Sequence, residues 1–217
     1  FDDADVFKGS PWVIASPERW AMWGWFRSDG RKSTILQCTY GFGRDELGGS
    51  GFMVSANITL KPTHSLDITL NGSLSQMNTR REYIDTLYYN ENLDVIYSNS
   101  TQLVDDIQLR INWTFTPNVS FQMFLQPFKA DIDYFGFKRL IAPKTLDFED
   151  YSYSRDPDFK LDNKIGTFVF RWEYSPGSTL FVVYNLNDNK WYSAEDAEWQ
   201  ESRSNALYMK LNYWFQI

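Results

Sequence analysis

The sequence predicts an all-β fold: the C-terminal portion, about nine strands, of an antiparallel transmembrane β-barrel of the outer-membrane type. Three observations predict it: apolar and polar residues alternate, connections alternate between short and long, and 18% of the residues are aromatic. The mean hydropathy of -0.45 and the absence of any apolar run near 18 residues exclude a transmembrane helix. A chain of this polarity still suits a barrel, because only every second residue of a barrel strand faces lipid.

The strands are predicted from period-two alternation. The clearest example runs from Phe52 to Leu60, where every second residue is apolar. The predicted strands are residues 20–27, 32–43, 52–61, 66–75, 103–115, 119–126, 164–174, 179–188 and 205–217. Most have roughly 9 to 15 residues, which favours transmembrane strands over the shorter strands of soluble sheets.

The connections between these strands alternate in length. Tight turns with Pro or Gly are predicted at residues 28–31, 62–65, 116–118 and 175–178, and long polar connections at residues 44–50, 78–100, 129–163 and 189–204. Outer-membrane barrels combine short periplasmic turns with long extracellular loops. We therefore expect the C-terminus on the periplasmic side, residues 1–19 as an extracellular loop segment, and residues 20–217 as the C-terminal barrel strands.

Aromatic residues cluster at strand ends beside the short turns. The predicted membrane-interface aromatics are Phe26, Trp113, Phe115, Trp172, Tyr174, Tyr213 and Phe215. Aromatic side chains favour the membrane–water interface, so this set predicts one girdle. The alternative is the edge of a β-sandwich core, which gives no reason for the alternation of connection lengths.

Charged residues also occupy the polar phase of the strands. Those predicted to face the lumen are Asp67, Asp106, Arg110, Arg171, Glu173 and Lys210. Two interpretations stay open: ion pairs that brace the wall, and charges that line water and select solutes.

An odd number of strands does not suit a bacterial single-chain barrel, which has an even count. We therefore expect further strands of the same barrel upstream of Phe1, on the same polypeptide or on a separate piece of it.

No catalytic constellation is found, and no catalytic, cofactor-binding or metal-ligating residue is predicted. His64 stands alone in a tight turn, and Cys38 is interpreted as a small apolar filler in an alternating run. The net charge of -7 argues against a nucleic-acid partner. Acidic residues are predicted in two loops: Asp147, Glu149, Asp150, Asp156, Asp158 and Asp162, then Glu195, Asp196, Glu198 and Glu201. They predict a solvated acidic surface, with a calcium site as the alternative.

Four stretches carry a family resemblance: residues 126–128 (QPF), 142–148 (APKTLDF), 156–159 (DPDF) and 171–184 (RWEYSPGSTLFVVY). The chain resembles the C-terminal end of a family from Bacteroidota and relatives described as domain of unknown function 5916. The resemblance implies a signal peptide and an N-terminal domain similar to family-9 carbohydrate-binding modules, followed by a barrel. No trace of that domain is found in this sequence.

Three hypotheses for function follow. The first is a non-enzymatic subunit of the bacterial outer membrane, acting as a channel or as a structural and docking component of an envelope complex. The second is the membrane anchor of a carbohydrate-binding or glycan-degrading protein. The third is a secreted β-sandwich lectin. The partners expected under the first are outer-membrane lipid, lipopolysaccharide, the remaining strands, and envelope proteins or glycans at the loops.

Overall fold

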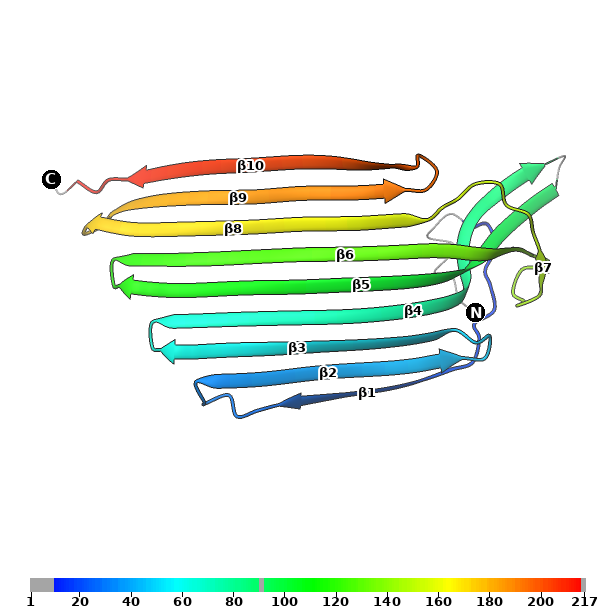
Figure 1. Ribbon diagram of the computed structural model, residues 1–217, viewed down its shortest axis with the longest axis horizontal. Helices are drawn as coiled ribbons and strands as arrows, with labels where there is room; N and C mark the ends of the chain where they lie inside the picture. The colour runs from blue at the N-terminus through cyan, green and yellow to red at the C-terminus, as the bar shows by residue number, and fades with distance from the viewer. Residues whose placement is uncertain (1–9, 90–91, 216–217) are drawn as a thin grey trace.

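The protein is described by a computed structural model that covers residues 10–89 and 92–215. These residues form one antiparallel sheet of ten strands (Figure 1). The strands are β1 (Arg19–Arg27), β2 (Thr34–Asp45), β3 (Ser50–Thr63), β4 (Leu66–Tyr89), β5 (Asn92–Thr116), β6 (Val119–Leu140), β7 (Phe148–Asp150), β8 (Phe159–Ser175), β9 (Ser178–Ser193) and β10 (Glu198–Asn212). The described residues include no helix, and hence none that could cross a membrane.

Strand order in the sheet follows the chain. Each of β1 to β6 pairs with the next strand, β6 pairs with β8, and β8, β9 and β10 continue the series. The short strand β7 pairs with the far end of β6. All nine predicted strands are present, and the predicted all-β antiparallel class is confirmed. Residues 216–217, assigned to the last predicted strand, lie outside the described residues.

The long connections differ from the prediction. Strands β4, β5 and β6 have 24, 25 and 22 residues, because each continues into a segment that was predicted as a loop. Strands β8, β9 and β10 likewise begin or end well inside predicted loops. The physical reason is that these extensions are not apolar on one face, so they lack the alternation on which the prediction depended. The four short turns occur where they were predicted, at the left in Figure 1.

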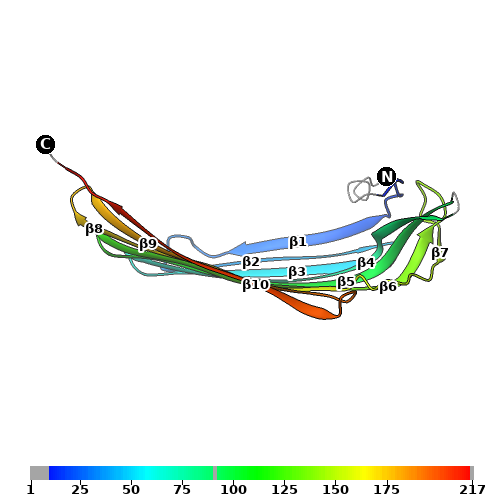
Figure 2. The same cartoon turned by 90° about the horizontal axis from the view of Figure 1, so that it is seen from above.

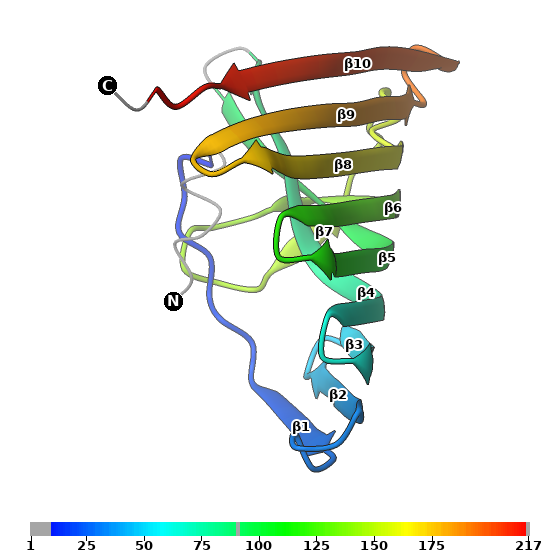
Figure 3. The same ribbon diagram turned by 90° about the vertical axis from the view of Figure 1, so that its left-hand side faces the viewer.

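The sheet is curved and open. Figure 3 looks along the strands and shows β1 and β10 leaning toward the same side, while Figure 2 shows the bend along the strands. Within the described residues, β1 and β10 each have one neighbour only, so the sheet is not closed into a barrel. Both edge strands run from the long-connection end to the short-turn end.

The only packed core of the described residues lies at the long-connection end. Ile14, Val95, Tyr97 and Leu140 are at most 1% exposed, and Trp12, Tyr83, Leu93, Leu146 and Phe148 pack around them. We call this region the cap; it comprises residues 10–18, the ends of β4, β5 and β6, and residues 141–158. The amide of Lys144 donates to the carbonyl of Val13 at 2.7 Å, which ties the segment before β1 to the β6–β7 connection. The cap lies on the side toward which the sheet edges curve (Figure 3).

Residues 10–18 of the predicted loop segment therefore form part of the cap. Residues 1–9 of that segment lie outside the described residues.

Candidate functional site

The two faces of the sheet differ in composition. One face carries apolar side chains, exemplified by Phe52, Val54 and Ile58 of β3, which are 37–43% exposed. Of the residues on the other face, Ser55, Asn57 and Thr59 are less exposed, although smaller, whereas Met53 is 48% exposed. Side chains diverge on a convex surface and crowd together on a concave one. The apolar face is therefore the convex face.

We call the apolar part of the convex face the apolar band. Its members are apolar residues that lie on this face by strand register and are not buried. They are Trp20, Met22 and Phe26 (β1), Leu36, Tyr40 and Phe42 (β2), Phe52, Val54, Ile58 and Leu60 (β3), Leu66, Ile68, Leu70 and Leu74 (β4), Ile107, Leu109, Ile111, Trp113 and Phe115 (β5), Phe121, Met123 and Leu125 (β6), Phe168, Phe170 and Trp172 (β8), Leu180, Val182, Tyr184 and Leu186 (β9), and Leu207, Met209 and Leu211 (β10).

The apolar band crosses the strands diagonally. The register can be followed from strand to strand along one lateral row of the convex face. This row is Gly24, Tyr40, Val54, Leu74, Asp105, Lys129, Asp162, Lys190 and Glu201. It begins within the band on β1 and ends on β10 at Glu201, whereas the apolar residues of β10 lie further along the strand, from Leu207 on.

This displacement gives an angle. From β1 to β10 the centre of the band moves by about ten residues along the strands, at about 3.3 Å per residue, while eight strand spacings of about 4.8 Å are crossed. The band is therefore inclined to the strand-perpendicular direction by about 40°. Strands that close into a transmembrane barrel are tilted by about 35–45° to the barrel axis.

The predicted interface aromatics lie at the short-turn end. Trp113 and Phe115 stack with ring centroids 4.2 Å apart, and Tyr213 and Phe215 lie 4.6 Å apart just after β10. Trp172 and Tyr174 meet edge to face at 5.9 Å. Phe26 lies on the convex face at the end of β1. All but the half-buried Tyr174 are at least 41% exposed. Their position in an interface stays a prediction.

The six charged residues predicted to face a lumen share the concave face by register. Arg171 and Glu173 form an ion pair at 2.8 Å. Asp106 accepts hydrogen bonds from Gln108 at 2.7 Å and Gln126 at 2.6 Å.

The other three residues of that set are Arg110, Asp67 and Lys210. The guanidinium of Arg110 lies over the Phe124 ring, 5.1 Å from its centroid. Asp67 and Lys210 lie on different strands, β4 and β10, and the structure does not bring them together. Amide and hydroxyl side chains cover most of the remaining surface of this face between β3 and β6, as Asn57, Thr59 and Thr69 illustrate.

Beyond the apolar band, the convex face of β5 to β10 carries charges. We call these ten residues the charged lattice. They are Asp105, Lys129, Asp131, Lys160, Asp162, Lys164, Asp188, Lys190, Glu201 and Arg203. Signs alternate between neighbouring strands, and five cations balance five anions. These ten residues together have no net charge, and Asp133 of β6 adds one further anion to the same face.

The ion pairs of the charged lattice span neighbouring strands. The ammonium of Lys160 lies 2.8 Å from Asp131, and that of Lys129 lies 3.7 Å from Asp162. Lys190 lies 3.4 Å from Glu201. The last two distances exceed the 2.7–2.9 Å typical of a charge-assisted hydrogen bond. Those two ammonium groups therefore keep hydrogen-bonding capacity for other partners.

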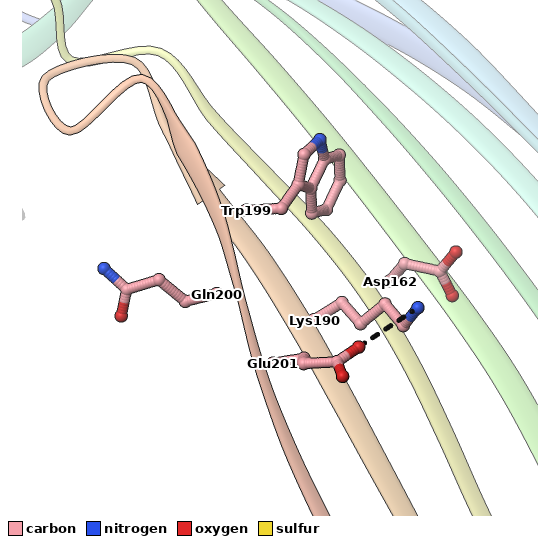
Figure 4. A pocket seen from close by; sticks show the side chains of 5 residues that line it. All are labelled: Asp162, Lys190, Trp199, Gln200 and Glu201. Atoms are coloured by element: carbon pink, nitrogen blue, oxygen red, sulfur yellow. Dashed lines mark ion pairs between the residues drawn. The ribbon is translucent and has the colours of Figure 1, made fainter.

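A shallow hollow of about 300 Å³ opens in the charged lattice near the start of β10 (Figure 4). Trp199, Asp162, Lys190, Gln200 and Glu201 line it. Figure 4 shows the Trp199 indole near the ion pair of Lys190 with Glu201, and the Asp162 carboxylate beside the Lys190 nitrogen. One carboxylate oxygen of Asp162 is covered and lacks a hydrogen-bond partner within the described part of the chain. The hollow therefore offers an aromatic wall, an ammonium group and carboxylates.

The predicted acidic loops need correction. Five of these residues belong to strands: Glu149 and Asp150 lie on β7, Asp162 lies on β8, and Glu198 and Glu201 lie on β10. Within residues 10–89 and 92–215, no group of three or more His, Cys, Asp or Glu side chains could hold a metal ion. The calcium alternative therefore has no site in the described residues.

Two carboxylates of the cap, those of Asp158 and Asp85, are held by specific contacts. Burial raises the pKa of Asp158, against the opposing effect of the Tyr134 amide, which donates to its carboxylate at 2.6 Å. Nearby, Tyr153 donates to Asp85 at 3.2 Å, and Arg155 forms an ion pair with the same carboxylate. These contacts fasten the β7–β8 connection across the end of β4.

The sequence prediction missed the charged lattice and the hollow. A signal was present, because opposite charges stand two residues apart on β8, β9 and β10, as in Asp188 and Lys190. Such spacing places both charges on one face of a strand. The signal was lost because those segments were assigned to loops.

Residues 4–217 match the protein family described as "Domain of unknown function (DUF5916)". A search of the curated proteins finds no match.

Proposed function

This chain belongs to the DUF5916 family, whose description assigns no activity, and we propose that it forms part of the wall of an outer-membrane β-barrel. The apolar band would face the hydrocarbon layer. The charged lattice and the cap would project on the extracellular side, and the short turns would face the periplasm. The concave face would line the lumen.

The observation that supports this proposal is the diagonal course of the apolar band. An inclination of about 40° is expected when tilted strands cross a flat bilayer, because every strand meets the hydrocarbon layer at a different point of its register. A water-soluble sandwich has no reason for such a shift. It would also need a second sheet over the apolar face, and the described residues form one sheet only.

The open edges define the partner that the wall requires. Because β1 and β10 run in the same direction, direct pairing between them would be parallel. An antiparallel barrel instead needs a strand of opposite direction against each edge. Nine strands form the wall, because β7 pairs only with the end of β6 and lies outside the main series. The remaining wall would therefore contain an odd number of strands and bring the total to an even number.

The most suitable role is a non-enzymatic channel. The concave face is polar between β3 and β6, although Trp23 and Trp25 of β1 also lie on it. Part of its charge is satisfied within the face, as the Arg171–Glu173 pair and the amide bonds to Asp106 show. Such a surface suits contact with water. A docking role is the second candidate, because the cap displays exposed apolar side chains, Tyr88 at 80% and Ile141 at 55% exposure.

Membrane insertion can be tested with two cysteines from one lateral row. In a Cys38→Ala background of the full-length protein, Val54→Cys lies in the apolar band and Lys190→Cys lies in the charged lattice. A membrane-impermeant maleimide added to the full-length protein in vesicles of phospholipid alone, without a glycolipid that could cover the lattice, should label the second and spare the first. Labelling of both would show that the convex face is in water, and protection of both would show that protein covers it. Either result would refute the membrane assignment.

The channel role can be tested by conductance of the purified full-length protein in planar bilayers. Discrete conductance steps are expected, with weak ion selectivity because the six charged residues predicted to face the lumen are three cations and three anions. A correctly inserted but electrically silent protein would favour the docking role.

A further inference from the structure

The hollow beside Trp199 is the strongest unassigned feature on the convex face. The Trp199 side chain is 56% exposed and packs against Tyr192, with ring centroids 5.6 Å apart and ring planes tilted by 44°. An exposed indole supported by a second ring offers a flat apolar surface. Lys190, Glu201 and Asp162 add one donor group and two acceptor groups around it.

The distance of the hollow from the hydrocarbon layer limits the class of ligand that it could bind. Lys190 lies four residues beyond Leu186, the last band residue of β9, and Glu201 lies six residues beyond Leu207 of β10. At about 3.3 Å per residue and a tilt of about 40°, the hollow would lie about 10–15 Å outside the hydrocarbon layer. A phospholipid headgroup region extends only about 5–8 Å on each side. A membrane lipid that reaches this depth must therefore have a thicker headgroup than a phospholipid.

The chemistry of the walls points to a sugar. Sugar rings present apolar C–H faces that can stack on an indole and hydroxyl groups that donate to carboxylates. The ion pair of Lys190 with Glu201 at 3.4 Å leaves the ammonium able to meet an anionic substituent such as phosphate.

The geometry points to a glycolipid site: we propose that the hollow at Trp199 binds a sugar of a phosphorylated membrane glycolipid whose acyl chains cover the adjoining apolar band. This inference rests on the proposed function. Asp188, Arg203 and Asn205 lie between the hollow and the band on β9 and β10. A lipid-borne sugar suits this arrangement, because the glycan of one molecule could span the separation while its acyl chains contact the band.

The test measures binding of lipopolysaccharide to the full-length protein in mild detergent, as glycolipid bound per protein over a range of concentrations. Wild-type protein should bind saturably, and Trp199→Ala should weaken binding about tenfold, as expected for loss of one aromatic contact. Lys190→Gln should weaken binding of phosphorylated lipopolysaccharide more than that of a dephosphorylated form. Trp25→Ala is the matched control, since Trp25 is 65% exposed but lies on the concave face of β1.

Three results would overturn the inference: equal binding by Trp199→Ala and Trp25→Ala, equal binding of phosphatidylglycerol, or equally tight binding of the free core oligosaccharide. The last would assign the hollow to a soluble sugar. The cysteine pair keeps the two proposals separate. If Val54→Cys is protected and Lys190→Cys labelled while Trp199→Ala has no effect, only the glycolipid site fails.

Discussion

The two halves of β8, β9 and β10 share one backbone geometry but present different surfaces. Pairing between β9 and β10 is regular from end to end, without a bulge where the surface changes. On β9, the convex face carries Leu180 to Leu186 in one half and Asp188 and Lys190 in the other. The backbone therefore does not mark the boundary. Side-chain chemistry alone does, which is expected when one continuous wall passes from lipid into water.

The cap provides a third environment. Its core residues are almost fully covered by protein, whereas no band residue is buried and several are more than half exposed, as Met209 at 69% shows. In the cap, stability depends on side-chain packing within the protein. In the band, it depends on the solvent outside. Substitutions should therefore destabilise the two regions for different physical reasons.

The largest effect is expected from a charge within the apolar band. Ile111→Arg on β5 should cost about 2–4 kcal/mol of folding free energy in lipid, because the guanidinium would enter the hydrocarbon layer. The measurement is the fraction of folded, heat-modifiable protein on gels and its urea midpoint in bilayers.

Leu103→Arg is the matched control, on the same strand and face but beyond the band. It should fold like the wild type. If both variants fold equally well, the convex face of β5 has no lipid-facing section.

The second effect concerns the cap. Leu140→Ala should destabilise the cap by about 2–3 kcal/mol, since Leu140 is 1% exposed and its truncation leaves a cavity. Hydrogen exchange should accelerate in the ends of β4 and β5 and remain slow in the apolar band. Leu207→Ala, at a site 61% exposed to the outside, is the control and should change exchange little. Global unfolding by Leu140→Ala would contradict the independence of cap and wall.

The part of the fold that could be predicted from sequence is the part with alternating polarity. Residues 52–61 and 66–75 are apolar on one face, so their phase and their short turn could be assigned. The ends of β4 and β5 could not, because polar and apolar residues occur on both phases there, as in Thr86, Leu87 and Tyr88. These ends are stabilised by contacts between distant segments, such as Ile14 with Val95.

The candidate site also has a part that could be predicted from sequence and a part that could not. The concave charges were assigned to a face from alternation alone, because their neighbours in the strand are apolar. The pairing of Arg171 with Glu173 follows from spacing of two on one strand. The hollow required the register of three strands, since Asp162, Lys190 and Glu201 come from β8, β9 and β10. No local pattern gives that register.

A third prediction uses the raised pKa of Asp158 in the cap. Because burial raises this pKa in the folded state, folding favours the protonated form. The stability of the wild type relative to Asp158→Asn should therefore increase as pH falls through the folded pKa toward the unfolded value of about 4. At neutral pH, Asp158→Asn should be neutral or stabilising, since the amide oxygen still accepts from Tyr134.

Asp158→Ala removes that acceptor and should cost about 1 kcal/mol. The readout is exchange of the Tyr134 amide as a function of pH. A wild type that loses stability relative to Asp158→Asn on acidification would show that hydrogen bonding outweighs burial at this carboxylate.

The smallest effect is expected in the charged lattice. Arg203 and Asp188 form an ion pair at 3.4 Å, and the Arg203 side chain is 57% exposed. In water, such a pair contributes about 0.2–1 kcal/mol and is screened by salt. A double-mutant cycle of Arg203→Gln and Asp188→Asn should give a coupling in that range that falls as salt is added. A coupling well above about 1 kcal/mol and insensitive to salt would mean that the lattice is shielded from water. The surface change along β9 would then not mark a passage from lipid into water, and both halves of the strand would share one low-dielectric environment.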